Sequence, residues 1–285
     1  MRKTIVSLVC GLALAAGSAL AQPAGLLDIY KVKVKRDKTL EFESAIRKLA
    51  DINRKKGDRW IAYSTEYGDS GTVYFSSRRA GYGDIENGMG AMMAAVQEAV
   101  GPSGMARMFA DLDSMTLWGM GELRRRRADL SVNSPGSDEE ISRLVATSRW
   151  IRTIRIDVKP GRMPDFIDAW KPWQAELGRV EPKAPVLVSV TESGPPALVV
   201  ALYYKSLKDV DEAYNGVQKA LASDTYRSYS RAVADLVSAT NWEIHRIRPE
   251  LSNPPDAILN ADPAFWKPKP PARPKPAAEK PGEKK

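Results

Sequence analysis

The side chain best suited to acid–base chemistry or metal binding in this sequence is its single histidine, His245. It lies in segment 241–247, whose apolar and polar residues alternate as in a β-strand. Because successive strand side chains point to opposite faces, His245 shares one face with Asn241 and Glu243, while Trp242 lies on the other. We therefore expect His245 on a polar or inter-sheet face, pointing away from Trp242.

Several common kinds of active site are absent from the sequence. A zinc site needs several His or Cys ligands, and the only cysteine is Cys10, close to the N-terminus. A serine nucleophile needs a base and is often found in a Gly-x-Ser-x-Gly turn, which does not occur here. The phosphate-binding loop that ends in Gly-Lys-Ser/Thr is also missing. We expect neither a metal nor a cofactor, and no catalytic residue stands out.

An aromatic helix face is the other feature that could form a site. In segment 163–177, Phe166, Trp170, Trp173 and Leu177 recur at helical spacing. Such a face is usually core, but it can also line a small apolar cavity between a helix and a sheet. The candidate ligand-pocket residues are therefore Trp170, Trp173, Tyr203, Asn241 and His245.

The net charge of +8 lies mostly at the two ends of the chain. Of the 43 lysines and arginines, two fall in 1–21 and seven in 267–285, whereas the latter segment holds only two of the 35 acidic residues. Residues 22–266 therefore carry a net charge of only +1 (34 − 33). A nucleic-acid-binding domain carries its positive charge on its folded surface, so we expect no nucleic-acid partner. The run Arg124–Arg127, next to Glu122 and Asp129, is interpreted as a solvated strand end rather than a basic binding patch.

The N-terminus has the pattern of a cleavable secretion signal. Met1-Arg2-Lys3 is followed by the uncharged apolar run 5–16 and by Ala19-Leu20-Ala21. The run is short for a membrane span, which needs about 20 apolar residues. We expect a signal peptide over 1–21, cleavage after Ala21, and a secreted or periplasmic protein without cysteine.

An internal repeat organises the rest of the chain. Strand and helix patterns in 26–131 recur in the same order in 150–252, and an offset of 124 residues aligns both the first and the last elements. Val34 corresponds to Val158, and Trp118 to Trp242. Each unit has the order β-α-β-β-α-β, with the second helical segment divided in two, which is the ferredoxin-like plan. A four-stranded sheet with helices on one face leaves the other face bare, so we expect the two sheets to pack face to face.

Two further segments complete the domain plan. The linker 132–149 contains Ser137 and Glu140 at capping-box spacing, which predicts a short helix. Residues 253–285 follow an Asn-Pro-Pro turn and become rich in Lys and Pro, which predicts a disordered tail. This basic tail could contact an anionic envelope surface or could serve only as a solubilising tail.

This pattern resembles a tandem fused member of the dimeric α/β-barrel superfamily over roughly residues 26–252. The resemblance rests on the Val158–Gly161 entry to a helix containing Phe166, on the two hairpins, and on the Asp-Leu-x-Ser-x-x-x-Trp pattern at 111–118 and 235–242. The superfamily includes cofactor-free antibiotic-biosynthesis-type monooxygenases, haem-degrading monooxygenases, stress-responsive barrels and NIPSNAP proteins. It implies an α+β fold in which the two units form one pseudo-dimeric barrel, with a single chain favoured over a dimer.

The resemblance leaves two functions open. The first is a small-molecule-binding or envelope-associated module without a cofactor, with a small hydrophobic ligand. The alternative is a cofactor-independent monooxygenase-like enzyme, in which His245, Asn241 or Tyr203 would supply the polar group. In haem-handling members the iron ligand is a histidine on a helix, and His245 is predicted on a strand, so haem is not expected.

Overall fold

The computed structural model of the 285-residue chain describes residues 25–267. The predicted signal peptide and residues 268–285 of the Lys/Pro-rich tail lie outside the described residues.

The described chain is an α+β structure whose elements follow closely the order expected from the sequence. The strands are β1 (Leu26–Val34), β2 (Ile61–Tyr67), β3 (Thr72–Arg79), β4 (Thr116–Arg126), β5 (Trp150–Val158), β6 (Val186–Thr191), β7 (Ala197–Tyr204) and β8 (Val237–Ile247). The α-helices are α1 (Thr39–Asn53), α2 (Tyr82–Ser114), α3 (Asp138–Thr147), α4 (Met163–Leu177), α5 (Leu207–Leu221), α6 (Asp224–Val233), α7 (Asp256–Ala261) and α8 (Pro263–Trp266). Short 3-10 turns occupy Arg36–Lys38, Ala128–Leu130 and Pro249–Leu251.

The eight strands form one closed antiparallel barrel in the order β1-β3-β2-β8-β5-β7-β6-β4. Within it, β1–β4 are arranged as β2-β3-β1-β4, and β5–β8 as β6-β7-β5-β8. The edge strands of the two sets join through the pairs β2–β8 and β4–β6. The expectation of two sheets packed only face to face is therefore corrected: their edges hydrogen-bond, which leaves no strand edge unpaired.

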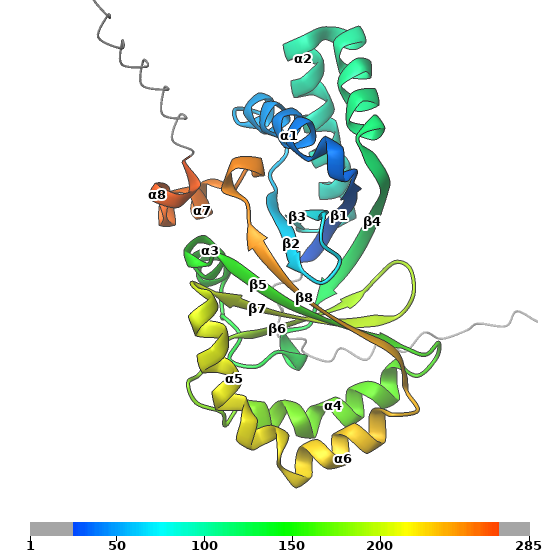
Figure 1. The fold of residues 1–285 in the computed structure, drawn as a ribbon, viewed down its shortest axis with the longest axis vertical. Coiled ribbons are helices and arrows are strands. Elements are labelled where there is room, and N and C mark those ends of the chain that lie inside the picture. The colour runs from blue at the N-terminus through cyan, green and yellow to red at the C-terminus, as the bar shows by residue number, and fades with distance from the viewer. Residues whose placement is uncertain (1–24, 268–285) are drawn as a thin grey trace, which may run out of the picture.

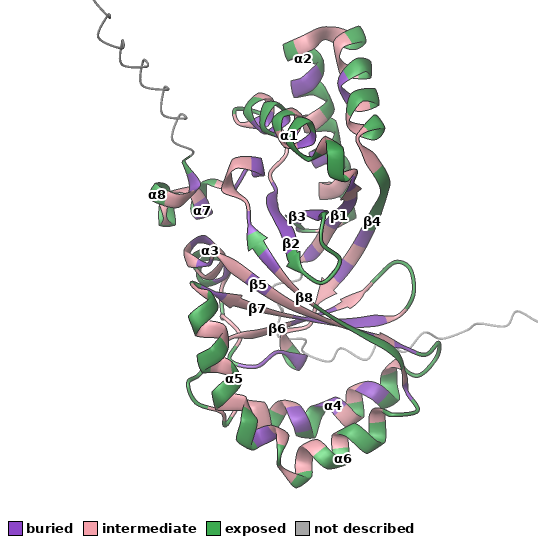
Figure 2. Cartoon of the chain, viewed as in Figure 1, coloured by how far each residue is buried: buried purple, intermediate pink, exposed green. Residues whose placement is uncertain are grey.

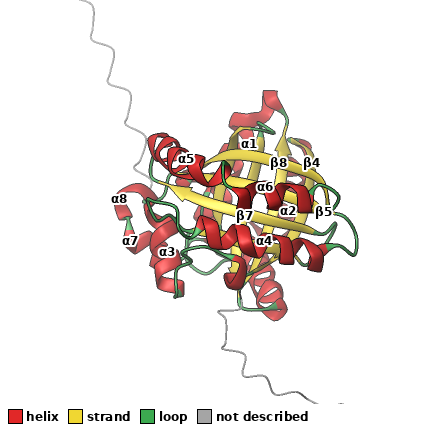
Figure 3. Cartoon of the chain, turned by 90° about the horizontal axis from the view of Figure 1, so that it is seen from below, coloured by secondary structure: helices red, strands yellow, loops and turns green. Residues whose placement is uncertain are grey.

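Helices cover the outside of the barrel in two groups (Figure 1). Helices α1 and α2 pack on the β1–β4 side, and α4, α5 and α6 pack on the β5–β8 side, as the view from below also shows (Figure 3). Buried residues gather on the strands and on the helix faces turned toward them, while the outer helix faces are exposed (Figure 2). None of the helices in the described part of the chain is long and apolar enough to cross a bilayer.

Helix α2 contains a break, as expected from the division of the second helical segment in two. Gly101 has a φ of 70°, outside the helical range, and is followed by Pro102. Proline cannot continue the hydrogen-bonding pattern of the preceding turn, so the chain bends there. The part of α2 before the break begins at Tyr82, so the glycine-rich stretch before Met89 is helical as well.

The two halves exchange short segments after their last strands. After β4, Ser131 Oγ accepts a hydrogen bond from Val188 N of the other half at 2.9 Å. After β8, Ser252 Oγ accepts one from Ala62 N at 2.8 Å. The leucine before each serine, Leu130 or Leu251, is buried in the opposite helix–sheet core.

One tryptophan of each half donates a hydrogen bond to the segment that comes from the other half. Trp170 Nε1 donates to Leu130 O at 3.0 Å, and Trp60 Nε1 donates to Leu251 O at 2.8 Å. Each half therefore contributes a segment that completes the core of the other, in addition to the strand pairs that close the barrel.

Helices α3, α7 and α8 form a small group at one end of the barrel (Figure 1). Helix α3 is the predicted linker helix, and Ser137 Oγ accepts from Glu140 N at its start. The expectation that residues from 253 onward are disordered is wrong for 256–266, which form α7 and α8. Ile258 and Trp266 are buried, and Trp266 Nε1 donates to Ala146 O on α3 at 2.9 Å. These apolar side chains provide buried surface that the Lys/Pro-rich sequence beyond them lacks.

We expect Trp266→Ala to lower the free energy of unfolding by about 3–5 kcal/mol, because it empties a fully buried site and removes one hydrogen bond. Urea denaturation followed by circular dichroism measures this. The control is Trp242→Ala, at a tryptophan that is 55% exposed, which should cost less than about 1 kcal/mol. Equal, small effects of both changes would show that α8 does not stabilise the barrel.

Candidate functional site

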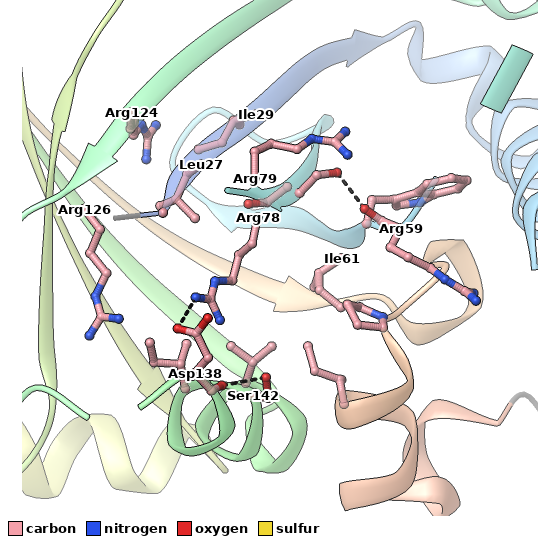
Figure 4. A pocket seen from close by; sticks show the side chains of 18 of the residues that line it. Leu27, Ile29, Arg59, Ile61, Arg78, Arg79, Arg124, Arg126, Asp138 and Ser142 are labelled. Atoms are coloured by element: carbon pink, nitrogen blue, oxygen red, sulfur yellow. Dashed lines mark hydrogen bonds and ion pairs between the residues drawn. The ribbon is translucent and has the colours of Figure 1, made fainter. Parts of the chain in front are cut away.

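A cavity of about 790 Å³ begins inside the barrel and opens at the end where α3 and α7 lie. Figure 4 shows how the inward side chains of the strands and those of α3 meet around it. Its barrel walls come from alternate positions of seven strands: Leu27 and Ile29, Ile61 and Tyr63, Ser76 and Arg78, Arg124 and Arg126, Ile151 and Thr153, Leu187 and Ser189, and Ala201 and Tyr203.

The walls are mainly apolar, with a few polar groups placed among them. Isoleucines from β1, β2 and β5 face the cavity, and Leu187 of β6 adds to this surface. Hydroxyl groups come from Tyr63, Tyr203, Ser76 and Thr153. Burial raises the pKa of both tyrosines, so their phenols stay protonated and can donate hydrogen bonds at neutral pH. An apolar hollow with a small number of convergent polar groups is the usual form of a ligand site.

A layer of charged side chains fills the other part of the barrel. Glu122 of β4 accepts from Lys31 Nζ of β1 at 2.8 Å and from Arg155 Nη1 of β5 at 2.7 Å. Arg124 Nε donates to the other oxygen of the same carboxylate. The group thus joins strands from both halves of the barrel. The inner faces of the two sheets are therefore not wholly apolar, whereas the expectation of face-to-face packing assumed that they were.

The ionisation of Glu122 follows from these partners. Burial alone would raise its pKa, but Arg124, Lys31 and Arg155 outweigh burial and lower the pKa to about 2. Burial lowers the pKa of Lys31, and the hydrogen bond to Glu122 opposes that change. Glu122 is therefore a fixed anion at neutral pH, which makes it a poor general base.

His245 lies inside the barrel, fully buried between two threonines. Its Nδ1 is 3.1 Å from Thr65 Oγ1, and its Nε2 is 2.8 Å from Thr153 Oγ1. Burial, followed by the charges of Arg124 and Lys31, lowers its pKa to about 3, so the ring is neutral. The Glu243 carboxylate, at 3.9 Å from Nε2, is too distant for a hydrogen bond. Both ring nitrogens thus have hydroxyl partners, and the ring stands behind Thr153 rather than in the cavity wall.

The structure separates the other predicted site residues. Tyr203 lines the cavity. Asn241 is exposed and lies near the middle of β8, four residues before His245. Trp242 is on the outer face, where Arg152 lies over its ring at 4.7 Å, so it points away from His245 as the strand alternation predicted. Asn241, Tyr203 and His245 therefore do not converge on one site.

Trp170 and Trp173 are buried in the helix–sheet core rather than in the cavity wall. Trp173 stacks with Tyr229 at a centroid distance of 6.1 Å, and Trp170 contacts the same ring at 6.0 Å. Their placement corrects the expectation that one of them lines a ligand pocket. The outer face of the β5–β8 sheet is closely covered by α4 and α6, and the free volume lies on its inner face instead.

No protein-family model matches this sequence, and no curated protein matches it. Solved structures do match its shape. An anthrone oxidase-like protein has a TM-score of 0.52 at 12% identity, covering 79% of this chain and 92% of that one. A candidate monooxygenase from Fusobacterium nucleatum subsp. nucleatum has a TM-score of 0.51 at 12% identity, covering 80% and 94%. The chain shares the fold of the dimeric α+β-barrel proteins. At this identity the likeness concerns the fold alone.

The arginine run on β4 contributes to the cavity, and the sequence analysis did not assign it to a site. Arg124 and Arg126 face the cavity, whereas Arg125 faces outward and pairs with Glu192 at 2.5 Å. Arg127, just beyond the strand, pairs with Asp129. The interpretation of the run as a solvated strand end is therefore wrong for its alternate members. Because successive side chains of a strand point to opposite faces, the alternation within β4 predicts that Arg124 and Arg126 share one face and that Arg125 lies on the other.

No group of three or more His, Cys, Asp or Glu side chains within the described residues is arranged to hold a metal ion. Two of the acids that line the cavity pair with arginines of its wall: Asp58 binds Arg79, and Asp138 binds Arg78 at 2.5 Å. The chemistry of the cavity is thus that of an apolar hollow with guanidinium and hydroxyl groups.

His245 should make the stability of the barrel depend on pH. Because its folded-state pKa of about 3 lies below the ordinary 6.5, its contribution is complete above pH 6.5 and is lost as the pH falls toward 3. We expect the wild type to lose about 1–2 kcal/mol of unfolding free energy between pH 6.5 and 5. His245→Gln, which can still bond both threonines, should remove most of that loss.

Urea denaturation at pH 7, 6.5, 5 and 4 provides the test. Below pH 4.5 both proteins should lose stability, because the pKa of Glu122 is also lowered, so this range serves as an internal control. His245 is the only histidine of the chain. If His245→Gln keeps the wild-type slope between pH 6.5 and 5, the ring is not buried and neutral as described.

Proposed function

We propose that this chain is an exported protein that binds a small hydrophobic molecule inside its barrel without the help of a cofactor. The observation that carries the proposal is the cavity of about 790 Å³, which falls within the range of about 300–1,000 Å³ typical of ligand pockets. Its walls come from strands of both halves, so they are held by the closed hydrogen-bond pattern of the barrel rather than by loops.

We also propose that the barrel arose from two ferredoxin-like units, 26–131 and 150–252, fused in tandem. Three observations support this. Both strand sets have the same internal order. The register shifts between Lys33 and Val34, and again between Asp157 and Val158, 124 residues later. The exchanged segments at Ser131 and Ser252 make equivalent hydrogen bonds to the opposite half. A fused pair closes its own barrel, which favours a monomer. A NIPSNAP or antibiotic-biosynthesis-monooxygenase-like subtype remains a prediction.

Export rests on the N-terminal pattern described above, and the basic tail is proposed to contact an anionic envelope surface. We expect the protein expressed with its own N-terminus in a Gram-negative host to appear in the periplasmic fraction with Gln22 as its first residue. Intact-mass measurement and N-terminal sequencing check this. A full-length product confined to the cytoplasm would contradict the export proposal and leave the barrel proposal intact.

Binding in the cavity is tested with the uncharged fluorophore N-phenyl-1-naphthylamine, whose emission rises in apolar surroundings. We expect saturable binding to the wild type and at least a tenfold loss of affinity in Ala201→Trp, because the new indole occupies the cavity opposite Thr153. The control is Ala239→Trp, at an exposed position of β8. Undiminished binding to Ala201→Trp, or none to the wild type, would contradict the proposal; Ser76→Phe serves if Ala201→Trp does not fold.

The alternative of a cofactor-independent monooxygenase-like enzyme receives less support from the geometry. The neighbours of similar fold include a candidate monooxygenase and an anthrone oxidase-like protein, but at 12% identity. Such an enzyme needs a base that reaches its substrate. His245 is enclosed by threonines with a pKa of about 3, and Glu122 is held by three cations. We therefore place ligand binding before catalysis.

A further inference from the structure

Five arginines line the cavity, and three of them lie at inward-facing strand positions. Arg78 of β3 and Arg124 and Arg126 of β4 all occupy inward-facing positions, and Figure 4 shows them around the same hollow. Two of these arginines bond an acidic side chain: Arg78 donates to Asp138, and Arg124 donates to Glu122 of the charged layer. No acidic side chain within the described residues is bonded to Arg126.

Arg126 is the least satisfied of the three. Its Nη2 donates to Ser134 Oγ at 2.6 Å and to Pro135 O at 3.2 Å. Its Nε and Nη1 are buried and make no hydrogen bond to the described residues. Burial, and then the like charge of Arg78, lower the pKa of Arg126. A buried charged donor without a partner costs free energy that an incoming acceptor would recover.

Arg124 also has donors to spare. Its Nε bonds Glu122, but its two terminal nitrogens make no hydrogen bond to the part of the chain that the structure describes. The side chain is only 7% exposed and lines the cavity. Two neighbouring inward positions of one strand therefore present unused guanidinium nitrogens beside the same apolar hollow.

The geometry points to a ligand class, and this inference rests on the proposed function. We infer that the cavity binds an organic anion, whose acidic group is held by Arg126 together with Arg124, and whose apolar body lies against Ile29, Ile61 and Ile151. The apolar walls would not favour a bare inorganic ion, because most of the cavity would remain filled with poorly bonded water.

The experiment compares two probes of equal chain length, decanoate and decanol, as competitors of bound N-phenyl-1-naphthylamine at pH 7. The two differ in the charge of the head group. Hydrogen bonds to charged groups are stronger than those to neutral groups, so decanoate should displace the fluorophore at a concentration at least tenfold lower than decanol. Equal potency of the two competitors would overturn the inference.

The decisive variant is Arg126→Met, which keeps side-chain volume while removing the charge. Replacing an unpaired buried charge with an apolar side chain should not destabilise the fold. The preference for decanoate over decanol should fall toward onefold. The matched control is Arg125→Met, a neighbour on the same strand that faces outward and pairs with Glu192, and it should keep the full preference.

The remaining outcomes are also decisive. If Arg126→Met keeps the wild-type preference, Arg126 does not hold the acidic group and the inference fails. If Arg126→Met does not fold, Arg126→Gln replaces it in the same comparison. Absence of fluorophore binding to the wild type defeats the proposed function itself. Fluorophore binding without a preference for decanoate defeats only the anion inference.

Discussion

The barrel interior contains several buried cations and few anions, and its arrangement depends on how these charges are paired. Glu122 alone bonds Lys31, Arg124 and Arg155, which come from β1, β4 and β5. Removing that carboxylate would leave Lys31 and Arg124 without an ionic partner among the described residues, which is strongly unfavourable in a region of low dielectric, while Arg155 would still bond Asp157. The same carboxylate fixes the direction of Arg124. Burial, followed by the charges of Arg124 and Lys31, lowers the pKa of His245 and keeps its ring neutral. The geometry of Glu122 therefore determines which part of the barrel is polar and which part is left open as a cavity.

Closure of the barrel makes this arrangement possible. The two halves are joined by two strand pairs and by the exchanged segments that begin at Leu130 and Leu251. Because each exchanged segment completes the core of the other half, separating the halves would expose two apolar cores as well as two strand edges. Rigid walls follow from this, and rigid walls suit a preformed cavity better than one that must close around a ligand.

Much of the fold could be predicted from the sequence because it depends on local periodicity. The alternation in β8 correctly placed His245 inside and Trp242 outside. The 124-residue offset aligned Val34 with Val158, and the strand register shifts next to each of these residues. Spatial pairings that cross the chain were out of reach: the strand pairs β2–β8 and β4–β6, and the packing of Trp266 on α3, join residues far apart in sequence.

The site was predicted less well, for a physical reason. Trp170 and Trp173 form the most conspicuous aromatic face, yet apolar side chains at helical spacing report burial and not free volume. Only Tyr203 among the predicted residues lines the cavity. The arginines of the cavity wall belong to a run of four. Arg124 and Arg126 face the cavity, whereas Arg125 between them faces outward.

The central claim is that the barrel interior receives an organic anion with its acidic group at Arg126. A crystal structure with 10-bromodecanoate tests it most directly, because the anomalous signal of bromine locates the tail independently of the head group. The account predicts a carboxylate oxygen within hydrogen-bonding distance of Arg126 and bromine among the apolar walls. Bromine outside the barrel, or a carboxylate turned away from both Arg124 and Arg126, would contradict it.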